Sequence, residues 1–193
     1  MDDSRSGQRW NQLVSVCQWG SSDLWDPLGL CDESSNQNQK TFLFTKGTTE
    51  EEIILFNKAL EHISQSERGR ELISNIEQSD VVITISFNYN DNVYYYPQSK
   101  TIEWDPFSGL RTGSGEIQLP SLSLAHELGH VEQDIMGELE GRSIIEIEEE
   151  NLRRTETPIA KQLDLPVRSN YFDVCQKDPF PRVIDPTSSI PVN

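Results

Sequence analysis

Ala125-His126-Glu127-Leu128-Gly129-His130 is the stretch of this chain that decides its fold and its chemistry. The two histidines are four residues apart, so on an α-helix they project from one face, about 40° apart around the axis. Two neutral imidazoles placed in this way bind one Zn²⁺, and a glutamate after the first histidine can take a proton from a zinc-activated water. We therefore predict a metal-binding helix with His126 and His130 as ligands and Glu127 as the catalytic base.

The residues around this stretch also predict a helix. Pro120-Ser121 marks its start, with the serine as N-cap, and Gly137 marks its end. Apolar residues recur at intervals of three and four and form a stripe opposite the two histidines: Leu124, Leu128, Val131 and Ile135. Gly129 costs about 1 kcal/mol relative to alanine in a helix. We expect its missing side chain to make room for the substrate or for a neighbouring element.

A catalytic zinc usually takes three protein ligands, and an acidic segment beginning sixteen residues after the second histidine can supply the third. Its sequence, EIEEENL, predicts a second helix with an apolar stripe through Ile145 and Leu152. Glu149 lies close to this stripe and is the preferred third ligand. Glu148 flanks the stripe on its other side and Glu156 recurs further along the helix, so both remain alternatives.

Composition limits the classes of partner. The chain has 193 residues, 35% of them hydrophobic, and a formal net charge of −16. Phosphate binding needs clustered lysines and arginines, so this charge argues against nucleic acid and against an anionic membrane surface. It fits a basic partner or a basic substrate segment. No segment is apolar enough to span a bilayer, the first residues lack a secretory signal, and three widely spaced cysteines predict no disulfide framework.

We expect three parts along the chain. Residues 1–47 form a polar N-terminal segment, residues 48–178 a compact domain, and residues 179–193 an irregular tail rich in proline and serine. His62, the third histidine, falls in the first helix of the domain and is expected to be an ordinary surface or half-buried residue.

Secondary structure within the domain predicts an α+β class, because helices are followed by a small sheet and then by a helix pair. The first helix starts with a capping-box pattern at Thr48-Thr49-Glu50-Glu51-Glu52. The sequence further predicts a helix over 67–77, strands over 81–89, 93–96 and 101–104, and a loop over 106–115. One of the last two strands could hold an extended substrate by strand addition.

The chain from about Gly69 to Tyr171 resembles the effector-type zinc metallopeptidases of bacteria. That family includes type III-secreted effectors that cut host kinases, and similar domains end polymorphic toxins. Besides the histidine motif, the matching residues are Trp104-Asp105-Pro106, Glu148-Glu149, Asn151, Glu156-Thr157-Pro158-Ile159-Ala160, Leu165-Pro166-Val167-Arg168 and Tyr171. The histidine motif is shared by many unrelated metallopeptidases, whereas the order and spacing of the later pieces are more specific.

This resemblance implies a zincin-like fold with a glutamate from the second helix as third zinc ligand. It also singles out Arg168 and Tyr171, since a cation or a phenol near the metal can stabilise an oxyanion. The alternative for these two residues is a structural ion pair and a packed ring.

A second resemblance lies upstream, where Trp25-Asp26-Pro27-Leu28-Gly29-Leu30 looks like the signature that closes the core of Rhs/YD-repeat toxins. In such proteins the shell is cut at this point and releases a C-terminal toxin. The alternative is an ordinary turn, since Asp-Pro and Leu-Gly are common loop dipeptides.

These observations predict a zinc-dependent endopeptidase that acts as a secreted bacterial effector or toxin. We expect delivery by a specialised secretion system into a target cell, with a protein substrate there and a cognate immunity protein as partners. Nucleic-acid binding and membrane insertion are not expected. Two alternatives stay open: a non-catalytic acidic binding module, and a zinc hydrolase that acts on cell-wall peptide.

Overall fold

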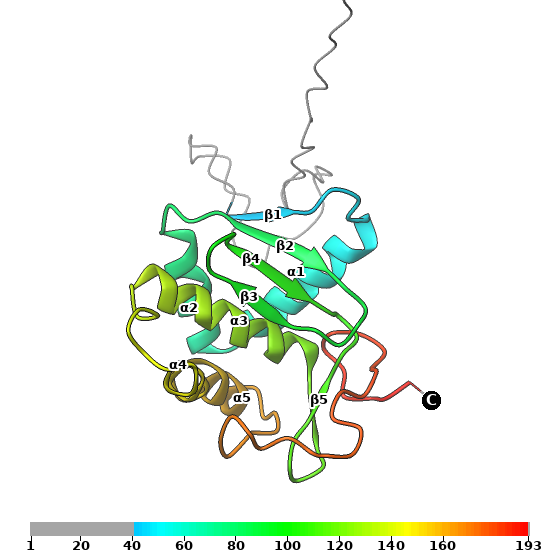
Figure 1. Cartoon of the computed structure of the whole chain (residues 1–193). Coiled ribbons are helices and arrows are strands. Elements are labelled where there is room, and N and C mark those ends of the chain that lie inside the picture. The colour runs from blue at the N-terminus through cyan, green and yellow to red at the C-terminus, as the bar shows by residue number, and fades with distance from the viewer. Residues whose placement is uncertain (1–40, 193) are drawn as a thin grey trace, which may run out of the picture.

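A small mixed sheet organises the described part of the chain, residues 41–192 of the computed structural model (Figure 1). Its strand order is β1-β2-β4-β3, with bounds Phe42–Phe44, Ile83–Phe87, Thr101–Trp104 and Tyr94–Tyr96 respectively. The strand β2 pairs in parallel with both β1 and β4, whereas β3 pairs antiparallel to β4 and forms an edge of the sheet. Parallel neighbours need a long crossover, which two helices supply between β1 and β2.

Three helices pack on one face of this sheet: α1 (Glu50–Ser64), α2 (Glu67–Glu77) and α3 (Pro120–Ile135). Thr49 and Glu52 complete a capping box at the start of α1, because each side chain accepts the other's backbone N–H. The strands alternate as a one-sided sheet should, with Ile83 and Ile85 fully buried and Thr84 half-buried between them.

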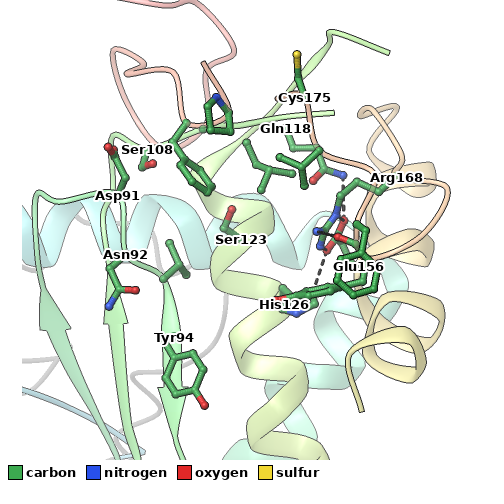
Figure 2. A pocket seen from close by; sticks show the side chains of 18 of the residues that line it. Asp91, Asn92, Tyr94, Ser108, Gln118, Ser123, His126, Glu156, Arg168 and Cys175 are labelled. Carbon is green, nitrogen blue, oxygen red and sulfur yellow. Dashed lines mark hydrogen bonds and ion pairs between the residues drawn. The ribbon is translucent and has the colours of Figure 1, made fainter. Parts of the chain in front are cut away.

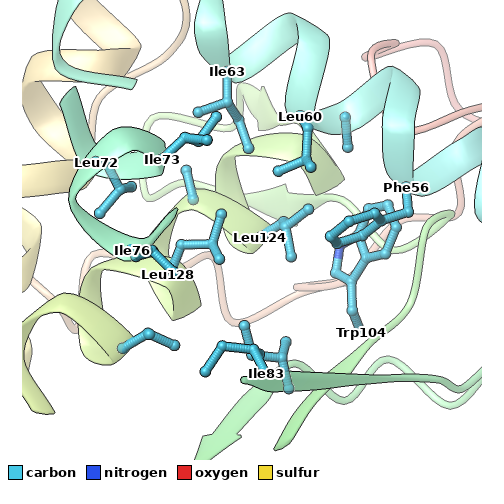
Figure 3. Packing of buried hydrophobic residues seen from close by; sticks show 14 of the residues in the cluster. Phe56, Leu60, Ile63, Leu72, Ile73, Ile76, Ile83, Trp104, Leu124 and Leu128 are labelled. Atoms are coloured by element: carbon cyan, nitrogen blue, oxygen red, sulfur yellow. The ribbon is translucent and has the colours of Figure 1, made fainter. Parts of the chain in front are cut away.

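One apolar core joins the sheet to these helices (Figure 3). Its largest fully buried side chains include Phe56, Leu60, Ile63, Leu72, Ile76, Ile83, Ile85, Ile102, Trp104, Leu122, Leu124 and Leu128. Trp104 also donates a hydrogen bond from its indole N–H to the Pro120 carbonyl at 3.0 Å. This bond fixes the start of α3 against the end of β4.

A second layer of short elements completes the unit beside α3. A helical arm comprises α4 (Ile144–Asn151), a π-helical turn η1 (Leu152–Glu156) and α5 (Thr157–Gln162). A two-stranded sheet pairs β5 (Leu110–Arg111) with β6 (Ile117–Gln118). None of the described helices is long and apolar enough to cross a membrane.

The structure confirms a mixed α+β arrangement with a small sheet and corrects several local expectations. The strand β1 was not expected; it lies within residues 1–47, the segment expected to be polar, and it pairs with β2. The expected loop over 106–115 contains β5. Ser121 is not the N-cap of α3; that position is Leu119. Ser121 is buried instead, and its hydroxyl lies 2.9 Å from His62 Nδ1.

The C-terminal residues, expected as an irregular tail, are irregular but attached to the domain. Arg182 pairs with the fully buried Asp105 carboxylate and lies over the Phe107 ring at 5.6 Å. Val183 is buried and donates its N–H to the Phe107 carbonyl at 2.8 Å. These contacts hold the C-terminal segment against the residues that follow β4.

Candidate metal centre

The two histidines of the motif lie side by side on α3. Their ring centroids are 4.8 Å apart and the rings are nearly perpendicular, at 84°. Both side chains are buried, His126 at 6% exposure and His130 at 8%. The predicted stripe opposite them is also buried, except at its last member, Ile135, which is 36% exposed. The helix is therefore enclosed by the core on one face and by the arm on the other.

Glu148 on α4 is the carboxylate that reaches both histidines. Its Oε2 lies 2.9 Å from His126 Nε2 and 3.2 Å from His130 Nε2. The three donor atoms lie within 4.8 Å of one another, the only such cluster of His, Cys, Asp and Glu ligands among residues 41–192. Two imidazole nitrogens and one carboxylate oxygen are the donor set that zinc takes in catalytic sites.

Glu149, the preferred third ligand from the sequence, lies elsewhere. Its carboxylate accepts the backbone N–H of Tyr171 at 3.0 Å. The apolar stripe that favours Glu149 runs through Ile145 and Leu152, but Ile145 is 54% exposed. The buried residues of α4 are instead polar: Glu148 and Asn151.

Glu156 reaches the same histidine from the other side of the ring. Its Oε2 lies 2.9 Å from His126 Nδ1. In an unbroken α-helix, eight residues overshoot two turns by about 80°, so Glu148 and Glu156 would diverge around the axis. The π-turn η1 takes more residues per turn, so that eight residues close about two turns. Both carboxylates can then face His126.

The outer nitrogen of each imidazole has a fixed partner. His126 Nδ1 is bound by Glu156, and His130 Nδ1 lies 2.9 Å from Gln133 Oε1. Gln133 is itself held, because it donates to the Ile147 carbonyl at 3.2 Å. Partners of this kind fix the ring orientation and the tautomer of metal-binding histidines. The Nε2 atoms are thereby turned toward Glu148.

The ionisable groups of the cluster shift one another's pKa values in favour of their charged forms. Burial alone lowers the pKa of His126, but hydrogen bonds to Glu148 and Glu156 outweigh it and raise the pKa to about 9. Burial raises the pKa of both glutamates, but hydrogen bonds to their partners outweigh it. Hydrogen bonds from His126 and His130 lower the pKa of Glu148 to about 2. Hydrogen bonds from His126 and Arg168 lower the pKa of Glu156 to about 2. Both carboxylates are therefore ionised and available at neutral pH.

Glu127 lies between the histidines and the edge strand. Its side chain is buried, and burial raises its pKa, opposed by the charges of His126 and His130 and by a hydrogen bond from the backbone of Tyr95 on β3. A carboxylate with a raised pKa is suited to receive and return a proton.

Arg168 and Tyr171 both lie at this cluster, in different ways. The Arg168 guanidinium is buried against Glu156, donating through Nε at 2.9 Å and also through its second terminal nitrogen. This contact is the structural ion pair that the sequence left open as the alternative role of Arg168. The Tyr171 ring is stacked on His126 with centroids 6.2 Å apart, and Tyr171 is only half-buried.

A cleft of about 570 Å³ opens over these residues. Figure 2 shows His126, Glu156 and Arg168 on one side of it, Asp91, Asn92 and Tyr94 on the other, and Ser123 between them. Glu127, Glu148 and Tyr171 also line the cleft. Two members of the His126, His130 and Glu148 group, His126 and Glu148, therefore border the cleft.

Two residues of the site, Gln118 and Gln133, were missed in the sequence. Gln118 Nε2 donates to Glu156 Oε1 at 3.0 Å and to the Pro166 carbonyl at 2.9 Å. Gln133 follows His130 by three residues, a spacing at which side chains on a helix meet, so it could have been found. Gln118 carried no such local signal, because its partners are 38 and 48 residues away.

Comparisons of the chain with family models, with curated proteins and with solved structures gave no match.

Proposed function

We propose that this chain is a zinc-dependent endopeptidase with a zincin-like fold. One observation carries the proposal: His126 Nε2, His130 Nε2 and Glu148 Oε2 converge, with the buried Glu127 carboxylate in the same cleft. The donor chemistry fits zinc, and each imidazole has an outer partner that orients it. We assign Glu148 as third ligand in place of Glu149.

His126, His130 and Glu148 would hold the zinc, which would supply polarisation of a substrate carbonyl and a water with its pKa lowered toward about 7. Glu127 takes the proton as the water attacks and later gives it to the leaving amine. Its buried setting raises its pKa, which makes the carboxylate a stronger base for the first transfer. His126 keeps its orientation during the reaction because Glu156 holds its Nδ1, and Arg168 in turn holds Glu156.

Oxyanion stabilisation falls to Tyr171 more than to Arg168. The Arg168 guanidinium is committed to Glu156 and to the Tyr171 carbonyl, whereas the Tyr171 ring lies in the cleft beside His126. The edge strand β3 borders the same cleft through Tyr94, so an extended substrate can pair with it. This assigns the strand-addition role to β3 over β4, since β4 is paired on both sides.

The biological role proposed is that of a bacterial effector or toxin delivered into a target cell. Its support is the resemblance to effector metallopeptidases and the formal charge of −16, which suits basic substrate segments. The Rhs-like stretch at 25–30 lies outside the described residues, so the release of a toxin domain is a proposal from sequence alone. A cognate immunity protein belongs to the same proposal.

The metal site is tested by elemental analysis of the purified chain. We expect close to one zinc per chain, loss of that zinc in His126→Ala, and retention in Glu127→Gln. Glu149→Gln is the matched control, because Glu149 neighbours Glu148 in sequence but contacts Tyr171. A chain that binds no zinc would support the alternative of a non-catalytic acidic module.

The reaction is tested by sequencing new N-termini in lysate treated with the intact chain or with Glu127→Gln. We expect Glu127→Gln to cut at least about 100-fold more slowly. Undiminished cleavage by this variant would refute the assigned base. A parallel incubation with cell-wall material distinguishes the alternative hydrolase, which would release wall peptides and leave lysate proteins intact.

The toxin role is tested in cells. Expression of the chain without an immunity partner should stop growth, and expression of Glu127→Gln should not. Equal harm from both forms would show that toxicity does not come from the cleft.

A further inference from the structure

The cleft residue Tyr171 belongs to a segment that is neither helix nor strand. This segment lies between the end of α5 at Gln162 and the isolated bridge that Val174 forms with Thr112. A side chain on such a segment is placed less precisely than one on a helix or strand, unless other groups hold its backbone. The position of the Tyr171 ring beside His126 therefore depends on the contacts of its peptide groups.

Two side chains hold the backbone of Tyr171, one on each side of the residue. The Glu149 carboxylate accepts its N–H at 3.0 Å, and Arg168 donates to its carbonyl at 3.2 Å. The Arg168 guanidinium carbon also lies 5.5 Å from the centroid of the Tyr171 ring. Arg168 is itself fixed by the buried Glu156 (Figure 2). Both contacts therefore lead back to the helical arm, one to α4 and the other to η1.

The far end of the same segment is anchored separately. The Asp173 carboxylate accepts the Ser169 N–H at 2.7 Å, and the Asp173 N–H donates to the Asn170 carbonyl at 3.1 Å. Gly113, in the turn between β5 and β6, donates to the Asp173 carbonyl at 3.2 Å, and a Cβ on Gly113 would lie 2.1 Å from Asp173 Oδ1. The segment therefore keeps its anchor at Asp173 when its contact with α4 is removed.

Adjacent carboxylates of α4 reach two different parts of the site. Glu148 contacts both histidines, and Glu149, the next residue, contacts the Tyr171 N–H. Successive residues on a helix point about 100° apart, so neighbouring side chains of one helix can serve two groups at once. The placement of α4 that brings Glu148 to the histidines thus also sets the position of Tyr171.

We propose that Glu149 is a positioning residue, which holds the Tyr171 peptide so that the ring lies against His126 in the cleft. This inference rests on the proposed peptidase function, in which Tyr171 stabilises the oxyanion. Glu149 is not among the described residues that line the cleft, so it acts on the reaction through Tyr171. Misplacing a group in an active site by about 1 Å can lower a rate about 100-fold.

Kinetics of zinc-loaded variants test this role. Glu149→Ala should lower kcat about 10- to 100-fold with little change in KM or zinc content, because the ligands remain and only the hold on Tyr171 is lost. Glu149→Gln should recover most of that loss, because its amide oxygen can still accept the Tyr171 N–H. Glu150→Ala is the matched control with unchanged kcat, since Glu150 is the next residue of α4 and pairs with Arg153. Loss of zinc in Glu149→Ala, or an unchanged kcat, overturns the proposal.

A double-mutant cycle separates positioning from a general effect on the arm. In a Tyr171→Phe background, Glu149→Ala should lower kcat by less than about threefold, because the phenol that it would misplace is already gone. A further loss of about 10-fold or more in the double variant would contradict the proposal. It would show that Glu149 acts on the metal ligands instead of through Tyr171.

A measurement without turnover keeps this proposal distinct from the peptidase function. Fluorotyrosine labels the five tyrosines of the chain, and Tyr171→Phe assigns one resonance in the fluorine NMR spectrum to Tyr171. Glu149→Ala should shift that resonance, whereas Glu150→Ala should leave it in place. This result, with no cleavage by the unmodified zinc-loaded chain, supports the role of Glu149 in holding Tyr171 and refutes the peptidase. A Tyr171 resonance that Glu149→Ala does not move overturns the role of Glu149, whether or not the chain cleaves peptides.

Discussion

Asn151 occupies the space that a side chain on Gly129 would fill. A Cβ built at Gly129 would lie 1.9 Å from Asn151 Oδ1 and 2.9 Å from Thr155 Oγ1. The same Asn151 side chain donates to the His126 carbonyl at 2.7 Å. The missing side chain thus brings α4 and η1 against α3, which places Glu148 at the two histidines. The room expected at Gly129 is taken by a neighbouring element.

Gly129→Ala should therefore weaken the metal site although alanine is the better helix former. Overpacking costs about 1–3 kcal/mol, against a gain of about 1 kcal/mol in helix propensity. We expect unchanged or lower stability in urea denaturation and weaker zinc binding in a chelator competition. Ser123→Ala on the same helix is the control and should keep zinc affinity. A Gly129→Ala protein that binds zinc as tightly as the unmodified chain would contradict this reading.

Glu156→Gln should destabilise the protein and weaken zinc binding together. The variant leaves the buried Arg168 guanidinium without its carboxylate, and breaking a buried pair in this way costs about 3–5 kcal/mol. It also removes the charge that holds His126 Nδ1, an effect worth about 10- to 100-fold in metal affinity.

The double variant Glu156→Gln/Arg168→Met separates these two effects of Glu156. Removing both charges should restore part of the unfolding free energy without restoring zinc affinity. Recovery of both would show that Glu156 acts on stability alone.

Zinc affinity should rise with pH. The metal-free protein keeps a proton on His126, whose pKa is raised to about 9 by Glu148 and Glu156, and zinc must displace that proton. Between about pH 7 and that pKa, the dissociation constant should fall about tenfold per pH unit. Competition with a chelator of known pH dependence measures the slope, and a flat profile would show that no proton is released.

The linked stability of the metal-free protein has the opposite sign. A raised histidine pKa stabilises the fold fully below the unfolded value of 6.5, and that contribution is lost as the pH rises through about 9. The Tm of the metal-free protein should fall over this interval relative to that of His126→Gln. Parallel Tm curves for the two proteins would contradict the assigned pKa.

Arg68→Met should destabilise the π-turn η1, which Arg68 contacts from α2. Arg68 on α2 donates to the Arg154 carbonyl at 2.9 Å, within η1, and pairs with the buried Glu132 on α3. Losing it leaves Glu132 with Asn75 as its remaining hydrogen-bond partner, at a cost of about 3–5 kcal/mol. Hydrogen exchange should speed up at residues 152–157 before it does in β2 and β4.

Arg70→Met serves as the control for Arg68→Met, because Arg70 bonds only exposed carbonyls at the end of α1. It should leave exchange at residues 152–157 unchanged. If Arg68→Met also leaves hydrogen exchange at residues 152–157 unchanged, the buried pair of Arg68 and Glu132 does not stabilise the π-turn.

Local pattern was enough to find much of the fold. The helix over 67–77 and the strand over 101–104 have the bounds that periodicity predicted. His62 is half-buried beside Ser121, as expected of an ordinary residue. The strand β1 escaped notice because three residues give too little periodicity, and only pairing with β2 makes them a strand.

The sequence by itself determined the histidine pair, because a spacing of four on a helix sets two side chains on one face whatever surrounds them. Tertiary structure decided which carboxylate joins the pair. The periodicity of the sequence does not distinguish Glu148 from Glu149. The orientation of the helical arm depends on the π-turn and on the close approach of the arm to α3 at Gly129. The close approach at Gly129 joins segments distant in the chain, and so does the hydrogen bond from Arg68 on α2 to the π-turn at the Arg154 carbonyl. No local pattern encodes such contacts. For the same reason, only the folded chain pairs Arg168 with Glu156.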